Sequence, residues 1–119
     1  MEIKLSDAEF IIMEILWREG EIRASKVANI AKEETGWEKN TTYTLISRLI
    51  NKGAVNRSSP NFLCSPTLKR SEISFTESKK ILEKMYGGSI KLFVKAFLDE
   101  QKISDEELNE LKKLINNHK

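Results

Sequence analysis

A ten-residue stretch, NTTYTLISRL at positions 40–49, carries hydrogen-bonding side chains on one side of a predicted helix. At helical spacing, Leu45, Ile46 and Leu49 share the apolar side. The opposite side has donors, acceptors and one cation but no carboxylate. Its members are Asn40, Thr44, Ser47, Arg48 and Asn51, with Tyr43 at the edge. Asn, Thr and Ser are mediocre helix formers, whereas solvated faces usually use Glu and Lys. The composition of this side therefore favours a binding surface.

These side-chain types match the groups that double-stranded DNA presents in its major groove. Arg can donate two hydrogen bonds to guanine O6 and N7, Asn can pair with adenine, and Thr can contact a thymine methyl group or a phosphate. The sequence therefore predicts that residues 39–52 form a recognition helix. The alternative is an ordinary amphipathic helix whose polar side faces water.

The charges are segregated along the chain in a way that the net charge hides. The 119 residues sum to +2, yet residues 39–71 contain six cations and no Asp or Glu, which gives +6 in that window. The remaining 14 basic and 18 acidic residues give −4. Such segregation is typical of proteins that bind a polyanion, although a chance gap in the acids produces the same pattern.

The basic stretch continues beyond the predicted helix into a turn. Lys52, Arg57, Ser58 and Ser59 can contact phosphates, and such contacts position a protein on DNA without reading its sequence. A solvated loop that lacks acids is the alternative. The residues predicted to contact DNA are Lys39, Asn40, Thr41, Tyr43, Thr44, Ser47, Arg48, Lys52, Arg57 and Ser58.

Three short helices with tight connections are predicted before that turn. Ser6 and Glu9 form a capping-box pattern, and apolar positions continue to Gly20, which ends the first helix. A second helix is expected to start at position 24 or 25 and to stop before Gly36, and Gly53 closes the third. Three helices in about fifty residues have the size of a helix-turn-helix unit.

Two short β-compatible runs follow the third helix. Residues 54–57 and 62–65 flank the turn sequence SSPN, which predicts a hairpin. Pro66 marks the exit from the second strand, because proline cannot donate to a strand ladder. A two-stranded ribbon directly after a third helix is the plan of a winged helix.

The last part of the chain is predicted to be helical from Thr76, with a break at Gly87 and Gly88. Residues 90–98 are apolar on nearly every side, and such a helix must be buried all round. About fifty residues are too few to bury it within one chain, so a second copy is the expected partner. An intramolecular core and a cofactor pocket are the alternatives. The predicted dimerisation residues are Ile90, Phe93, Val94, Phe97, Leu108, Leu111, Leu114 and Ile115.

Ser104 and Glu107 form a second capping-box pattern, which opens the final helix. The predicted fold class is mainly α (α+β), with a winged helix-turn-helix domain at residues 1–70 and a C-terminal helical dimerisation domain at residues 71–119. A twofold dimer of recognition helices fits pseudo-palindromic DNA with half-sites about one or two turns apart. The expected partners are double-stranded, pseudo-palindromic DNA and a second copy of the chain.

Other classes of function find little support in the sequence. No stretch approaches the roughly 18 apolar residues of a membrane span, and no signal-peptide pattern is visible, so a cytoplasmic protein without membrane insertion is expected. The one cysteine, Cys64, favours a reducing compartment and a small buried side chain over a redox sensor. His118, the one histidine, has no candidate co-ligand, and neither a nucleophile–base pair nor a glycine-rich phosphate loop is visible. We expect no metal, no cofactor and no enzymatic activity.

Four segments, spread over almost the whole chain, carry a family likeness. They are SDAEFIIMEILW at residues 6–17, GWEKNTTYTLISRLINKGAV at 36–55, SKKILEKMYGGS at 78–89 and SDEELNELKKLI at 104–115. Together they resemble the penicillinase repressor family, the BlaI/MecI-type regulators of β-lactam resistance. The resemblance implies a homodimeric winged-helix repressor that blocks transcription at promoter dyads. It also implies that the groove-facing positions are Asn40, Tyr43, Thr44 and Arg48.

The same resemblance implies a route by which repression is relieved. In this family a membrane sensor-protease binds the antibiotic, after which the repressor is cleaved at an Asn–Phe bond in the dimerisation helix. The matching bond here joins Ala96 to Phe97, with Ala in place of Asn and one extra residue between the bond and the Gly87-Gly88 pair. A copper-responsive sister group carries paired Cys-x-Cys motifs, which this sequence lacks.

Three function hypotheses follow from the sequence. The first is a dimeric repressor of β-lactamase or cell-wall stress genes. The second is a repressor of the same family that answers another signal. The third is a winged helix that binds another protein, which predicts apolar residues on the outer side of the third helix. Few lie there beyond Tyr43, so the sequence favours DNA as the partner.

Overall fold

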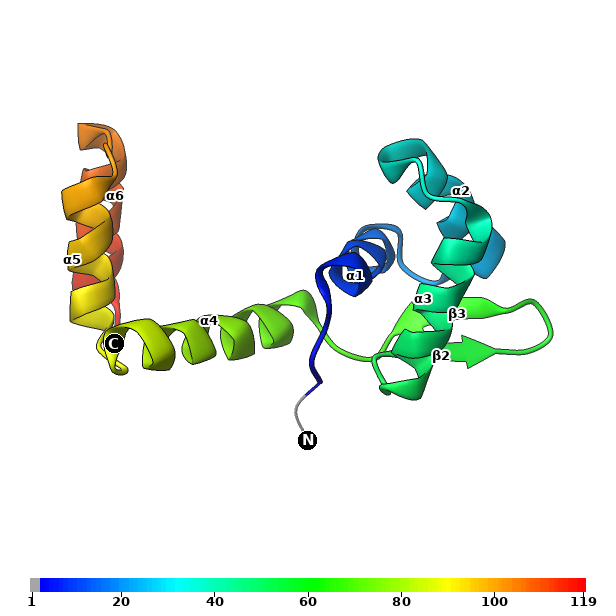
Figure 1. The fold of residues 1–119 in the computed structure, drawn as a ribbon. Helices are drawn as coiled ribbons and strands as arrows, with labels where there is room; N and C mark the ends of the chain where they lie inside the picture. Colours follow the sequence, from blue (N-terminus) through cyan, green and yellow to red (C-terminus); the bar gives the residue numbers. More distant parts are fainter. Residues whose placement is uncertain (1–2) are drawn as a thin grey trace. The chain divides into compact units, whose positions relative to one another are not determined.

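The computed structural model describes residues 3–119. The chain divides into two compact units, Met1–Thr76 and Glu77–Lys119. The described residues form six helices and one three-stranded sheet (Figure 1). The predicted fold class is confirmed, because the chain is mainly helical and its small sheet follows the winged-helix plan.

The first helix, α1 (Asp7–Glu19), begins where its capping box predicts. Ser6 Oγ accepts a hydrogen bond from the Glu9 backbone N–H at 3.1 Å, and Glu9 Oε1 accepts one from the Ser6 N–H at 2.8 Å. These bonds satisfy N–H groups that the start of a helix leaves free. The helix ends at Gly20, whose φ of 79° is a conformation that favours glycine.

Helices α2 (Ala24–Thr35) and α3 (Lys39–Asn51) pack with α1 around one core. Helix α3 contributes the apolar side that its spacing predicts. Each large aliphatic side chain buried in this way stabilises the fold by about 1.5–3 kcal/mol, so the core fixes which side of α3 faces outward. The buried hydrophobic residues are Ile12, Met13, Ile15, Leu16, Val27, Ala28, Ala31, Leu45, Ile46, Leu49, Ala54, Val55, Cys64 and Ile73.

Strands β2 (Val55–Ser58) and β3 (Leu63–Pro66) form the predicted hairpin, called the wing below. Val55 pairs with Pro66, so the second strand ends at the proline. A third strand, β1 (Ile22–Arg23), pairs antiparallel with β3 and gives the order β1-β3-β2. The sequence did not predict β1, because two residues are too few to show an alternating pattern.

Helix α4 (Arg70–Tyr86) begins before Thr76, so the predicted start of continuous helix was too late. Its first turns pack on the first unit. Ile73 is only 6% exposed, and Arg70 Nη2 lies 3.6 Å from Glu14 Oε2 of α1. These turns carry no apolar stripe that marks a helix in the sequence, and their contacts with α1 override the weak local pattern.

The second unit contains α5 (Ile90–Glu100) and α6 (Asp105–Asn117). Ser104 Oγ accepts a hydrogen bond from the Glu107 N–H at 3.1 Å, which is one of the two bonds of the expected capping box. No side chain of residues 77–119 is fully buried. Within one chain α5 is therefore partly exposed, as expected for a unit that is too small to enclose it.

A buried carboxylate connects the start of α1 with the end of α3. The Glu9 side chain is 2% exposed, and its Oε1 lies 2.6 Å from Lys52 Nζ. Burial raises the pKa of Glu9, but hydrogen bonds from Lys52 and from the Ser6 N–H favour the ionised form more strongly. The net pKa of Glu9 therefore lies below its ordinary value of 4.5, and the folded state contains the ionised carboxylate.

Lys52→Met is expected to lower the free energy of unfolding at pH 7 by about 2 kcal/mol, because it leaves a buried carboxylate without its cation. We expect less than for a fully buried pair, since the Lys52 side chain is 39% exposed. Urea unfolding followed by circular dichroism measures the change. Lys26→Met, on an exposed position of α2, is the matched control.

The same pair predicts a pH dependence. Because the pKa of Glu9 is lowered by folding, its contribution is present above pH 4.5 and is lost as the pH falls through the folded value. The difference between native protein and Lys52→Met should therefore shrink in acid. Equal stability of the two proteins at pH 7 contradicts this account of the pair.

Candidate nucleic-acid interface

The two sides of α3 differ in exposure. Thr42, Leu45, Ile46 and Leu49 are buried against the rest of the first unit. All ten residues predicted to contact DNA are exposed, namely Lys39, Asn40, Thr41, Tyr43, Thr44, Ser47, Arg48, Lys52, Arg57 and Ser58. Burial of the polar side would have excluded a recognition helix. The observed exposure leaves this side open to a partner.

The outer side of α3 carries positive charge that is not neutralised nearby. Within residues 3–119, no carboxylate lies in salt-bridge distance of Lys39 or Arg48. Thr44 Oγ1 donates its hydrogen to Asn40 O at 2.9 Å, so this hydroxyl can only accept from a partner. Arg48 is therefore the side chain of this face best suited to donate two hydrogen bonds to one acceptor group.

Lys52 differs from the other predicted contact residues in its surroundings. Its ammonium group donates to Lys4 O at 2.8 Å as well as to Glu9 at 2.6 Å. Two acceptors within the protein thus bind the ammonium group that was predicted to contact a phosphate. The sequence does not predict this arrangement, since Glu9 and Lys52 meet only through the packing of α1 against α3.

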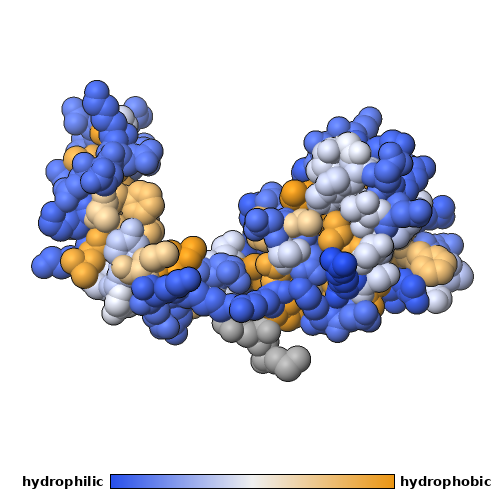
Figure 2. All heavy atoms as spheres, in the orientation of Figure 1, coloured by the Kyte–Doolittle hydropathy of each residue, from blue (hydrophilic) through white to orange (hydrophobic). Residues whose placement is uncertain are grey.

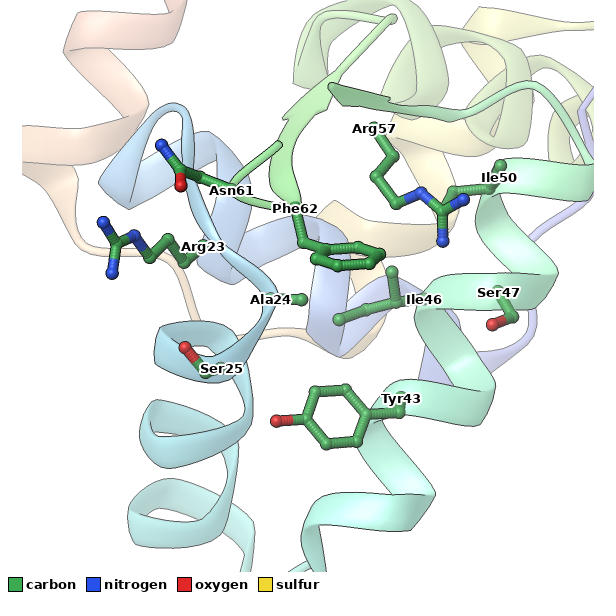
Figure 3. Close-up of a pocket in the computed structure, with 10 residues that line it drawn as sticks. All are labelled: Arg23, Ala24, Ser25, Tyr43, Ile46, Ser47, Ile50, Arg57, Asn61 and Phe62. Carbon is green, nitrogen blue, oxygen red and sulfur yellow. The ribbon is translucent and has the colours of Figure 1, made fainter. Parts of the chain in front are cut away.

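A pocket of about 470 Å³ lies between α3, the wing and the start of α2 (Figure 3). The sequence predicted Tyr43, Ser47 and Arg57 as part of one surface, and the pocket brings these three together. Its other lining residues were not predicted, because pairing of β1 with β3 is what carries the start of α2 to this place. They are Arg23, Ala24, Ser25, Ile46, Ile50, Asn61 and Phe62.

Cys64 is buried in β3 of the wing. Burial raises the pKa of its thiol above the ordinary value, and the nearby positive charge of Arg57 offsets this only in part. The thiol therefore stays protonated near neutral pH and packs as a small apolar group. In the part of the chain that the structure describes, no three His, Cys, Asp or Glu side chains gather in a way that could hold a metal ion.

None of the described helices has the length and apolar content needed to cross a bilayer. The first unit instead combines a winged helix with an exposed, acid-free side on its third helix. This fold and surface define a DNA-binding protein of the winged-helix class.

The chain belongs to the penicillinase repressor family, whose model matches residues 5–117. The resemblance drawn from the four sequence segments is thereby confirmed. The family consists of DNA-binding transcriptional repressors, so the expectation that the protein is not an enzyme is confirmed as well.

Relatives of this chain match nearly all of its length. The penicillinase repressor of Bacillus licheniformis is 30% identical over 118 residues, which cover 98% of this chain and 92% of that protein. The methicillin resistance regulatory protein MecI of Staphylococcus aureus strain N315 is 29% identical over 115 residues, which cover 95% and 94%.

Solved structures resemble about three fifths of the chain. The solution structure of the DNA-binding domain of the repressor BlaI has a TM-score of 0.55 and 29% identity, covering 59% of this chain and 88% of that one. The monomeric form of Bacillus licheniformis BlaI, in complex with the blaP half-operator, has a TM-score of 0.52 and 30% identity, covering 60% and 90%.

Proposed function

We propose that the chain acts in the cytoplasm as a homodimeric repressor whose two α3 helices bind a pseudo-palindromic operator. The observation that carries the proposal is the exposed, acid-free side of α3 on the fold of a repressor family. The Bacillus licheniformis relative, whose structure was solved on a half-operator, supports operator DNA as the partner.

The proposed contacts fall into two groups by chemistry. Arg48, Asn40 and Thr44 lie on the outer side of α3, where their groups match base edges. Lys39, Thr41, Ser47, Arg57 and Ser58 are exposed around them and suit phosphates or sugars, with Tyr43 at the rim. We leave Lys52 out of the contact set, because its ammonium group is held by Glu9 and Lys4.

Arg48→Ala is expected to remove specific operator binding while the dimer and the fold persist. A bidentate Arg–guanine contact contributes about 1–3 kcal/mol of discrimination, and a dimer loses two such contacts. A gel shift with the DNA upstream of the chain's own gene, against unrelated DNA of equal length, measures the loss. Arg18→Ala is the matched control, because Arg18 is an exposed cation of α1 that pairs with Glu19 and Glu34 of the protein itself.

The salt dependence of operator affinity tests whether α3 faces the DNA. Binding through several phosphates releases counterions, so the affinity of the native protein should fall steeply between about 50 and 200 mM salt. Affinity that does not change with salt, or unaltered specific binding by Arg48→Ala, means that α3 does not face the DNA.

The homodimer is proposed because the second unit cannot enclose its own apolar residues. Figure 2 shows hydrophobic residues at the surface of this unit. A helix with this much apolar surface needs a partner in water, and a twofold pair is the commonest solution. The large apolar residues exposed in α5 and α6 are Ile90, Leu92, Val94, Phe97, Leu98, Leu114 and Ile115.

Leu114→Asp is expected to turn the dimer into a monomer at micromolar concentration, because it places a charge in the proposed interface. Leu114 is 68% exposed in the single chain, so a loss of assembly cannot be ascribed to a lost core contact. Sedimentation velocity measures the mass. Asn116→Asp adds the same charge to an exposed position of α6 and should leave the dimer intact. A native protein that sediments as a monomer overturns the proposal.

We further propose that cleavage in α5 relieves repression of β-lactamase or cell-wall stress genes, with a membrane sensor-protease as the enzyme. The bond between Ala96 and Phe97 lies inside α5, and Phe97 is 48% exposed. A cut there divides a helix of the proposed interface and separates α6 from the DNA-binding unit. Each half-site is then held by one protomer alone, and the gain from linking two binding events is lost.

A chain that ends at Ala96 imitates the cleaved product. It is expected to bind the full operator at least about 10²-fold more weakly than the native chain, because its two copies are no longer linked. Its affinity for a single half-site should be unchanged, since the first unit retains its own core. Fluorescence anisotropy on both DNAs makes the comparison. Undiminished affinity for the full operator contradicts the proposed mode of relief.

A winged helix that binds another protein is the alternative reading of the same surface. The observation in its favour is the exposed Tyr43, 38% accessible, beside the partly apolar pocket of the first unit. A repressor of the same family that answers a signal other than a β-lactam is the further alternative. The gel shift separates the first alternative from operator binding, and the inducing signal is tested by which treatment of the cells leads to cleavage.

A further inference from the structure

Fold stability does not explain why a phenylalanine occupies position 62 in the turn of the wing. The residue is 56% exposed, so less than half of its surface is buried. Its φ of 50° lies in the left-handed region, which is costly for a residue with a bulky side chain. A large aromatic residue held in such a conformation at the surface points to a role other than packing.

The backbone of Phe62 is fastened to the start of α2. Its carbonyl oxygen accepts a hydrogen bond from the Ala24 N–H at 3.0 Å, next to the pairing of Arg23 with Leu63 between β1 and β3. The position of the Phe62 ring is thus set by the sheet and by α2, and not by the tip of the wing alone. The ring lines the pocket beside Ile46 of α3 (Figure 3).

The ring of Phe62 holds the guanidinium group of Arg57. Arg57 Cζ lies 4.9 Å from the ring centroid, within the range of a cation–π contact. Figure 3 shows the Arg57 side chain extending from β2 towards α3, where Ser47 lines the same pocket. An exposed Arg side chain without this contact samples many rotamers, most of which point away from α3.

No carboxylate competes for Arg57 among the described residues, so its charge stays available for a partner. We propose that Phe62 is a positioning residue, which aims the Arg57 guanidinium at a DNA phosphate beside the bases that the outer side of α3 faces. This inference rests on the proposed function of α3. It extends the proposed DNA-binding surface from α3 to the wing, where Phe62 in the turn sets the direction of Arg57 on β2.

A double-mutant cycle tests the coupling of the two residues. Operator affinity is measured as a function of salt for Phe62→Leu, Arg57→Ala and the double variant. Arg57→Ala should lower the slope of log affinity against log salt by about 0.9 for each substituted protomer, as one phosphate contact is lost. Phe62→Leu should weaken binding by about 2- to 5-fold per protomer, which is the population effect of an exposed cation–π contact, and should have no further effect when Arg57 is already Ala.

Two further variants separate positioning from folding. Phe62→Tyr keeps an aromatic face and should bind like the native chain. Asn61→Ala, the neighbouring exposed residue that lines the same pocket, should also bind like it. An effect of Phe62→Leu that persists in the Arg57→Ala background means that Phe62 acts on the fold of the wing, and overturns the proposal.

The failure of this inference is distinguishable from failure of the proposed function. If Arg57→Ala leaves affinity and salt slope unchanged while Arg48→Ala removes specific binding, the wing contact is wrong and the recognition helix stands. If Arg57→Ala weakens binding and Phe62→Leu does not, Arg57 finds the phosphate unaided and the positioning role is wrong. If Arg57→Ala, Phe62→Leu and Arg48→Ala all leave operator binding unaltered, the proposed function of α3 is wrong as well.

Discussion

The packing of α3 in the core of the first unit is the constraint on which the proposed DNA-binding surface depends. Leu45, Ile46 and Leu49 are buried on one side of the helix, so the other side has to face outward. The ion pair between the buried Glu9 and the partly exposed Lys52 fixes the end of α3 to α1. The direction of Arg48 is thus a consequence of the packing of its neighbours on the other side of the helix, as the proposed role of this side chain requires.

The two units differ in what stabilises them. The first has a continuous core of helices and strands, whereas the second buries no side chain fully by itself. In the proposed function, the first unit recognises the bases and the second unit holds the two copies of the chain together. Regulation can then act on the second unit alone, because a change there alters how many half-sites are held together and leaves the recognition helix as it was.

The sequence predicted what depends on short-range patterns. The capping box of Ser6 and Glu9, the apolar spacing of α3 and the hairpin after it all follow from residues close in sequence, and the structure contains them. Features that depend on long-range contacts escaped prediction. Strand β1 exists only through its pairing with β3, and the first turns of α4 are stabilised against α1. The same limit applies to the surface, since the partners of Lys52 and the contact between Phe62 and Arg57 arise from packing between separate elements.

The absence of a fully buried side chain in residues 77–119 has a consequence for the abundance of the protein. If the second unit gains its stability from assembly, the fraction of ordered chains depends on how many copies the cell contains. In the proposed dimer the assembled chains protect one another from general proteolysis, whereas newly made or diluted chains expose α5 and α6. Gene dosage and turnover then set a threshold, below which the repressor is removed before it can occupy its target.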